Sequence, residues 1–240
     1  MRSNFKPGAL TAPLPPVLVT VGDSVTSNIL TIGWTGILST VPPRTYISVR
    51  PERYSYGILK EKMEFVINLT TESMAWAVDY AGIYTGAKVD KWRECGLTQT
   101  KSKCVLAPTI AECPLSLECK VTDVIPSGTH DVFVADIVNV SCDESILDAN
   151  GRIELDRAGL LAYAHGEYFA LGEKLGKFGF STKVNREDAK KNAVRTAKNA
   201  ENYPKKNLKP PTERPKADGS GRQPFYVTAP GYRSKRGSKK

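Results

Sequence analysis

The residues best suited to chemistry lie between Asn28 and Ser55, where polar and aromatic side chains flank a Pro-Pro pair. Arg50 and Arg53 carry permanent positive charge, and Ser55 follows them at the expected start of a helix. Guanidinium groups and the free N–H groups of a helix N-terminus are suited to binding a phosphate. The segment therefore predicts an anion site. The plainer interpretation is a solvated arginine turn with an ordinary serine cap.

Two short strands must position these side chains. Within the expected strand Ile29–Trp34, large apolar residues alternate with smaller ones at a period of two. Gly33 lacks a side chain, so a planar ligand could approach the backbone there. Beyond the Pro-Pro pair, Thr45–Val49 is expected to form the second strand, and Ser55 to cap the helix that follows. Such a unit could hold a flat ring system together with an attached phosphate.

The rest of the first 182 residues also reads as short strands with few helices. Further strands are expected at Val17–Val21, Glu64–Leu69, Leu115–Ile125 and His130–Cys142. Short helices are expected after a cap at Thr71 or Ser73, and at Val89–Cys95. Because several strands precede any long helix, the pattern favours an antiparallel Greek-key barrel, a mainly β fold, over a parallel sheet.

The ordered set of motifs resembles the flavin reductase-like family with an FMN-binding split β-barrel, and within it the flavoredoxin-type proteins. Short glycine- and threonine-rich strings recur by chance, but their order along Ala12–Ser181 is specific. Besides the segment described above, the resemblance rests on Tyr80-Ala81-Gly82, Val89-Asp90-Lys91-Trp92, Gly128-Thr129-His130-Asp131-Val132-Phe133 and His165–Gly172. It implies FMN as cofactor and a homodimer with both pockets at the subunit interface.

The resemblance also implies which residues contact FMN. Asn28 offers a donor and an acceptor to the polar edge of the isoalloxazine, and Trp34 offers a flat apolar face. Lys91 could place positive charge near the reduced ring. The full set of candidate cofactor-binding residues is Asn28, Thr31, Gly33, Trp34, Thr35, Arg50, Arg53, Ser55, Lys91, His130 and Phe169. No catalytic side chain and no metal ligand is expected.

Several of these residues have plainer interpretations. Trp34 could be a core residue, Lys91 a surface lysine beside Asp90, and His130 a structural residue at a strand opening. For the second histidine, His165, a structural or dimer-interface role is favoured. No G-x-G-x-x-G follows a strand, so a nicotinamide dinucleotide would dock transiently on the flavin pocket.

The sequence thus predicts an FMN-binding oxidoreductase that transfers electrons or hydride through its flavin, with NAD(P)H or a redox protein as transient partner. Two alternatives remain open. The protein could be an FMN-binding electron carrier without NAD(P)H activity, or a nucleic-acid-associated protein recruited by a basic tail.

Charge is divided unevenly along the chain. Lys183–Lys240 holds 17 Lys and Arg against 5 Asp and Glu, a net charge of +12, whereas the first 182 residues carry −3. This tail has too few large apolar side chains to offset the entropy of ordering it. We therefore expect a barrel domain over residues 1–182 and a basic C-terminal extension over 183–240. The extension is expected to be largely disordered, helical at most over Asn185–Ala200, and able to bind polyanions weakly.

The cysteines and the N-terminus indicate the compartment. Five cysteines without C-x-x-C spacing predict neither a disulfide framework nor a zinc site, and Cys113, Cys119 and Cys142 are expected to be small apolar groups in strands. The N-terminal residues contain no apolar signal segment, and no run approaches the roughly 20 apolar residues of a membrane span. A cytoplasmic protein without a membrane partner is expected.

Overall fold

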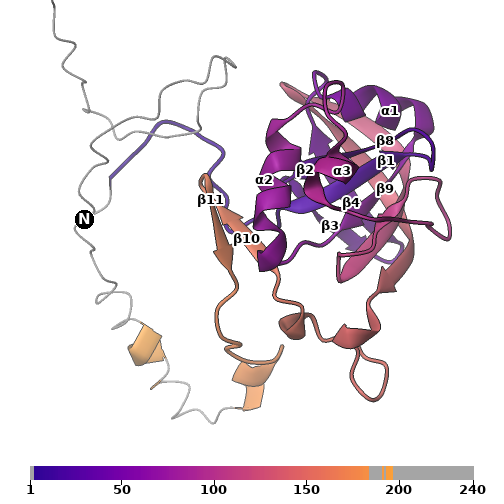
Figure 1. Cartoon of the computed structure of the whole chain (residues 1–240). Helices are drawn as coiled ribbons and strands as arrows, with labels where there is room; N and C mark the ends of the chain where they lie inside the picture. Colours follow the sequence, from indigo (N-terminus) through magenta and orange to yellow (C-terminus); the bar gives the residue numbers. More distant parts are fainter. Residues whose placement is uncertain (1–2, 184–190, 192, 197–240) are drawn as a thin grey trace, which may run out of the picture. The chain divides into compact units, whose positions relative to one another are not determined.

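The computed structural model describes residues 3–183, 191 and 193–196 (Figure 1). In this described part, a first compact unit extends to Leu171 and a second begins at Gly172. The second contains a short 3-10 helix, η4 (Phe180–Lys183). Of the helix expected over Asn185–Ala200, residues 191 and 193–196 are helical, and its other residues lie outside the described residues, as does the chain beyond 196.

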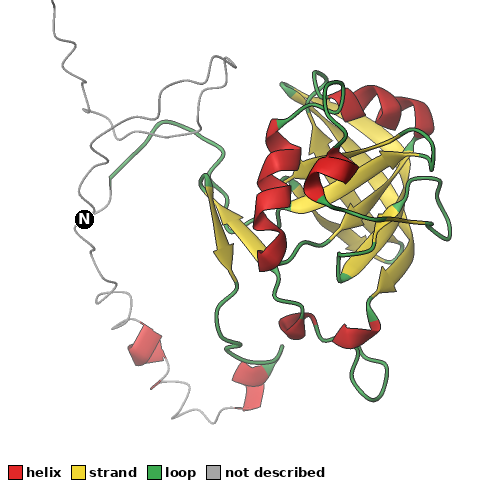
Figure 2. Ribbon diagram, viewed as in Figure 1, coloured by secondary structure: helices red, strands yellow, loops and turns green. Residues whose placement is uncertain are grey.

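A seven-stranded antiparallel sheet forms the centre of the first unit, and its strands curl around a common interior (Figure 2). The strand order is β2-β1-β5-β8-β9-β4-β3. The strands are β1 (Val17–Gly22), β2 (Ser27–Ile32), β3 (Thr35–Thr40), β4 (Pro43–Val49), β5 (Glu64–Asn68), β8 (Leu115–Ser127) and β9 (His130–Cys142). Since β4 and β5 follow each other along the chain but are separated by two strands, the sheet is not a simple meander. The expected mainly β, antiparallel fold is confirmed.

One strand of the sheet was not expected from the sequence. The strand expected over Ile29–Trp34 ends at Ile32, and the chain turns at Gly33 and Trp34 into β3, which pairs with β4. β3 lies at the edge of the sheet, and its Ile37 and Leu38 side chains are exposed. Such a strand has no continuous buried face, so it lacks the alternation by which strands are recognised.

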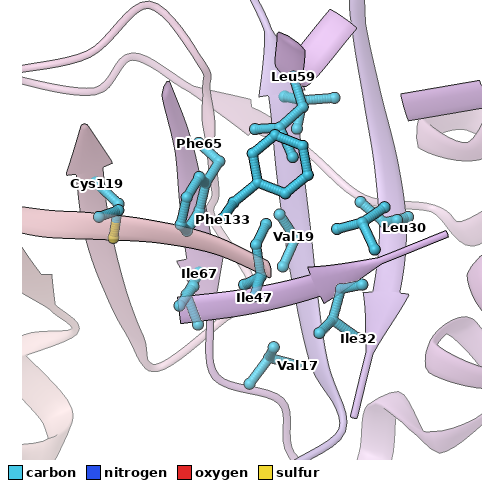
Figure 3. Packing of buried hydrophobic residues seen from close by; sticks show 13 residues of the cluster. Val17, Val19, Leu30, Ile32, Ile47, Leu59, Phe65, Ile67, Cys119 and Phe133 are labelled. Atoms are coloured by element: carbon cyan, nitrogen blue, oxygen red, sulfur yellow. The ribbon is translucent and has the colours of Figure 1, made fainter. Parts of the chain in front are cut away.

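The barrel interior is filled by apolar side chains from every strand of the sheet except β3. Phe65 of β5 and Phe133 of β9 are fully buried there, and Figure 3 shows them beside Val19, Leu30 and Leu59. Leu59 belongs to α1 (Tyr54–Lys62), which packs against this cluster. Because neighbouring residues of a strand point to opposite faces, burial of Thr45, Ile47 and Val49 directs the even-numbered residues of β4 outward.

Two helices cover the outer face of β1 and β2 (Figure 1). α2 (Ala75–Ile83) follows the 3-10 helix η1 (Glu72–Met74), and α3 (Lys91–Cys95) packs beside α2. Leu18 and Ile29 of the sheet meet Val78 and Trp92 of the helices in a second apolar cluster.

Two expected helix caps are wrong. α1 begins at Tyr54 with Arg53 in the N-cap position, so Ser55 lies inside the first turn. Thr71 takes the N-cap position of η1, but the Thr71 and Ser73 hydroxyls bond to each other at 2.8 Å and neither makes a capping hydrogen bond. In contrast, the Asp90 carboxylate accepts from two backbone N–H groups of α3 and caps that helix.

The remaining elements are short. Two hairpins accompany the barrel: β6 (Gln99–Thr100) with β7 (Thr109–Ile110), and β10 (Leu161–Ala164) with β11 (Glu167–Ala170). Two further 3-10 helices, η2 (Glu144–Ile146) and η3 (Leu155–Arg157), precede β10. His165 and Gly166 form the β10–β11 turn with φ of 52° and 93°, which suits a two-residue hairpin turn and gives this histidine a structural role.

The cysteine thiols follow the expected pattern in part. Cys113 and Cys119 are buried, Cys142 is half-buried, and all five cysteines are free. Burial raises the pKa of Cys113 to about 12, and it raises the pKa of Cys119 as well. Within the part of the chain that the structure describes, no helix is both long and apolar enough to span a bilayer.

Candidate functional site

Asn28 and Ser55 meet in a hydrogen bond that joins β2 to α1. The Asn28 amide donates from Nδ2 to Ser55 Oγ at 2.7 Å, and the two residues are 4% and 1% exposed. The serine hydroxyl is therefore engaged with the asparagine and does not cap the helix. A side chain fixed in this way presents its remaining amide groups in one orientation.

Lys91 is buried, which rules out the interpretation of a surface lysine. It is the first residue of α3 and is 4% exposed. Its ammonium group donates to the carbonyl oxygens of Ile29 and Ala81, each at 2.7 Å. The Ala81 carbonyl belongs to the last turn of α2, where helix carbonyls lack intrahelical partners and the dipole attracts cations.

Arg53 uses the same end of α2. Its guanidinium donates from Nη1 to the Gly82 carbonyl oxygen at 3.0 Å, next to the carbonyl that Lys91 binds. The C-terminus of α2 therefore holds two cations of the expected site in place. This role of α2 was not foreseen from the sequence, because the partners lie on three separate segments.

A pocket of about 330 Å³ opens between β2, α1 and the loop before α3. Its lining residues are Ser27, Asn28, Tyr54, Gly86, Lys88, Val89, Asp90, Lys91 and Trp92. Trp92 is held in this wall by a hydrogen bond of 3.0 Å from its indole N–H to Ser27 Oγ. Of the expected site residues, Asn28 and Lys91 line the pocket, and Ser55 supports Asn28.

Gly86 is a site residue that the sequence analysis missed. A Cβ at this position would lie 2.2 Å from Asn28 Oδ1, a distance that no real contact allows. The loop can therefore close against the Asn28 amide only because residue 86 has no side chain. The available signal was its place between the Tyr80-Ala81-Gly82 and Val89-Asp90-Lys91-Trp92 motifs.

A second group of expected residues, the outer cluster, lies where β4 ends and β9 begins and comprises Trp34, Arg50, Arg53 and His130. The Trp34 and His130 rings lie with centroids 4.6 Å apart, tilted by 42°. Val49 pairs with Asp131, so the chain places Arg50 opposite His130. Burial lowers the pKa of His130 most, and the positive charge of Arg50 lowers it further. Glu52 opposes them with an effect larger than that of Arg53, which also lowers the pKa.

The other four expected residues do not line the pocket, although Gly33 and Thr35 flank Trp34 in the chain. Thr31 donates its hydroxyl to the Val78 carbonyl, and Thr35 donates to the Tyr46 carbonyl at 2.6 Å, so both bind backbone. A Cβ at Gly33 would meet only Leu14, at an ordinary 3.8 Å. Phe169 is exposed on β11 and does not line the pocket. The structure does not place these four residues in the pocket wall with Asn28 and Lys91.

The donor set fits an anionic cofactor with a polar planar ring. The pocket offers an oriented amide and a buried ammonium group, and the outer cluster adds two guanidinium groups and an aromatic pair. Its volume is at the small end of the range of ligand pockets. Among the described residues, no group of three His, Cys, Asp or Glu is placed to hold a metal ion.

Comparisons with known proteins agree with this chemistry. The model of the flavin reductase like domain matches residues 10–172. Flavoredoxin of Desulfovibrio vulgaris (Miyazaki F) is similar in structure, with a TM-score of 0.71, 32% identity, and coverage of 76% of this chain and 100% of that one. An FMN-binding protein from Thermus thermophilus, solved with 1-cyclohex-2-enone bound, gives a TM-score of 0.63, 27% identity, and coverage of 74% and 99%. The NADPH-flavin oxidoreductase of Streptomyces viridifaciens is 25% identical over 134 residues, which are 54% of this chain and 68% of that protein.

Proposed function

Because the chain belongs to the flavin reductase-like family of split barrels, we propose that it binds FMN and acts as a flavin-dependent oxidoreductase. The observation that carries the proposal is the placement of Asn28 and Lys91 in one pocket, with Arg53 held at the same helix end as Lys91. When bound, FMN supplies the transfer of electrons or hydride. The protein's part is to bind, orient and electrostatically tune the ring.

Each residue has a definite task in this proposal. Arg50 and Arg53 hold the phosphate, while Asn28, fixed by Ser55, offers its amide to the polar edge of the ring. Lys91 supplies a fixed positive charge that favours added electron density. Trp34 offers an apolar face for packing.

The electron donor distinguishes the two forms of the proposal. A flavin reductase oxidises NADH or NADPH and reduces added flavin. An electron carrier exchanges electrons only with a protein partner. Steady-state oxidation of each nucleotide with free FMN present separates them. Turnover with either nucleotide supports the reductase, and the name of the Streptomyces relative makes NADPH the first to test.

The binding of FMN is tested by identifying the chromophore and by comparison with a phosphate-free analogue. The purified protein should be yellow or take up FMN stoichiometrically, with the flavin identified by spectrum and mass. Arg50→Ala should weaken FMN binding far more than riboflavin binding, because riboflavin lacks the phosphate. Arg93→Ala, which removes an exposed guanidinium on α3, is the matched control and should change neither. Equal losses for FMN and riboflavin in Arg50→Ala would contradict the phosphate assignment.

We also propose a homodimer, with the pockets at the interface. Exposed apolar side chains lie on β3, in the β3–β4 turn and on β9: Ile37, Leu38, Val41, Val138 and Val140. An exposed apolar surface beside a sheet edge is typical of a contact between chains. An obligate interface of this kind buries on the order of 2,000 Å² or more.

A further inference from the structure

The outer cluster of Trp34, Arg50, Arg53 and His130 is separate from the lining of the pocket. Arg50 and Arg53 belong to one turn, closed by a hydrogen bond of 3.0 Å from Arg53 N to the Arg50 carbonyl oxygen. This turn leads from β4 into α1, and His130 begins the neighbouring strand β9. Three basic residues thus lie where β4 ends and β9 begins, and one of them, His130, packs on the Trp34 ring.

The His130 ring is oriented from two sides. Its Nδ1 lies 2.9 Å from Thr129 Oγ1, and its face packs on Trp34. An imidazolium donates from both nitrogens, so with Thr129 as acceptor at Nδ1 it has a second N–H to offer to an anion. The adjacent carboxylate, Asp131, is engaged elsewhere, because it accepts from the Tyr56 hydroxyl at 2.5 Å.

Charge in this cluster opposes protonation of the ring. Burial and the two guanidinium groups keep the pKa of His130 below its ordinary value, and Glu52 offsets this only in part. An anion beside the arginines would reverse the balance, since a nearby negative charge favours the protonated form. A phosphate monoester carries nearly two negative charges at neutral pH, which is enough to engage both arginines and the imidazolium.

We propose that Arg50, Arg53 and His130 form a site for a phosphate monoester, and that His130 takes up a proton from solvent when the monoester binds as the dianion. The proposal rests on the proposed function in that the 5′-phosphate of FMN is its first candidate ligand. The 2′-phosphate of NADPH has the same chemistry and is the second source. Binding is therefore coupled to pH through this histidine.

The direction of the coupling follows from linkage. His130 has a lowered pKa without the anion and a higher one with it, so proton uptake occurs between these two values. The affinity for the dianion is highest below the pKa that His130 has in the ligand-free protein. It falls as pH rises through the pKa that His130 has in the complex. The affinity is lost by about tenfold for each unit by which the anion raises the pKa of His130.

The two histidines make a direct test possible. His130 and His165 give two imidazole signals by NMR, and His165, in the β10–β11 turn, is the internal reference. Saturating FMN should raise the titration midpoint of His130 and leave that of His165 unchanged, whereas riboflavin should move neither. If NADPH raises the midpoint and FMN and NADH do not, the proposal holds with the 2′-phosphate as its ligand. The proposal is overturned if no phosphate monoester raises it, or if riboflavin raises it equally.

Two variants separate this site from the general fold. Arg50→Gln should raise the His130 midpoint without any ligand, because one repelling charge is removed; an unchanged midpoint would contradict the electrostatic account. His130→Gln should remove the fall in the FMN-to-riboflavin affinity ratio as pH rises between the two His130 midpoints, and His165→Gln should preserve this fall. If the protein binds no flavin, inorganic phosphate is the probe: a shift of His130 alone then supports the site while the proposed function fails, and no shift overturns both.

Discussion

Lys91 illustrates how one residue can serve both the fold and the site. Its ammonium group is buried, yet it donates to two backbone carbonyls from different elements, β2 and α2. A buried charge is tolerated when such hydrogen bonds replace its hydration. The same bonds fix the cation in the wall of the pocket, so structural and functional constraints coincide at this side chain.

Replacing Lys91 tests this double role. Lys91→Met leaves the carbonyl oxygens of Ile29 and Ala81 buried without their donor, which should cost about 1–3 kcal/mol of unfolding free energy. FMN affinity should fall as well. Urea unfolding and flavin titration measure the two effects. Lys88→Met is the control, because Lys88 lines the same pocket but is exposed. The unfolding free energy of this variant should hardly change. Equal stability of the Lys91 and Lys88 variants would contradict the role of Lys91.

At the level of elements, the loop between α2 and α3 depends on Gly86. In Gly86→Ala, the new Cβ would collide with the Asn28 amide, which is the mobile end of a side chain rather than backbone. The amide should therefore rotate away from Ser55, and FMN affinity should fall about tenfold, the equivalent of one lost hydrogen bond. The loss of affinity should exceed the loss of stability.

Gly57→Ala is the matched control for this loop variant. Gly57 lies inside α1, where a Cβ meets nothing within 4 Å, so alanine should stabilise the helix by about 0.5–1 kcal/mol. FMN affinity should be unchanged. Isothermal titration and thermal melts of both variants provide the comparison. Retention of full FMN affinity in Gly86→Ala would remove Asn28 from the site.

A second element-level prediction concerns Glu118, which anchors residues 101–108 to β8. The side chain is 1% exposed and accepts from the backbone N–H groups of Lys103 and Cys104 and from the Asn139 amide. Burial alone would raise the pKa of Glu118, but these donors outweigh it and hold the pKa below its ordinary value. The carboxylate therefore stabilises the fold above pH of about 4.3, and this contribution is lost as pH falls through the lowered pKa.

Glu118→Gln should accordingly destabilise the protein most at neutral pH. One carboxylate oxygen becomes an N–H₂ group facing donors, at a cost of about 1–3 kcal/mol. The difference from the parent protein should shrink as pH falls through the lowered pKa of Glu118, because the parent carboxylate itself then becomes protonated. Denaturant unfolding at several pH values measures this difference in stability. Glu144→Gln, at an exposed glutamate, is the control. A penalty that does not depend on pH would contradict the charged state.

For the whole molecule, the proposed dimer is tested by a charge on its expected surface. Leu38→Glu should shift sedimentation from the mass of a dimer to that of a monomer, because a carboxylate would be buried without a partner. Val25→Glu places the same charge on the β1–β2 loop, at a side chain that is 91% exposed, and should leave the dimer intact. A monomer that binds FMN in the parent protein would contradict the proposal.

The basic extension is tested by truncation before Lys183. We expect the shortened chain to keep its FMN stoichiometry and nearly the same melting transition, since the matched domain ends at residue 172. It should lose any affinity for polyanions, and that affinity in the full chain should fall steeply with salt. A large loss of thermal stability would instead mean that the extension packs on the barrel, for example through Phe225–Val227. Retained nucleic-acid binding after truncation would exclude the tail as the binding segment.

The order of motifs along the chain was sufficient to identify the family and the antiparallel barrel, and both are confirmed. Strand periodicity and turn residues are local properties, so β1, β4, β5, β8 and β9 are recognised within a few residues of their bounds. β3 was not, because an exposed edge strand carries no alternation. The expected binding roles of the candidate residues remain predictions, although the structure groups most of them.

Contacts between distant segments could not be predicted from the sequence. Ser55 was expected as a helix cap from its neighbours, but its partner Asn28 lies 27 residues away and turns it into a support for the pocket. Lys91 binds a carbonyl 62 residues away, and its burial follows from the packing of α3 against α2 and β2. The need for glycine at position 86 exists only once the loop closes on Asn28. Local pattern selects the type of each element, whereas the partner of a buried polar group depends on which elements the folded chain brings together.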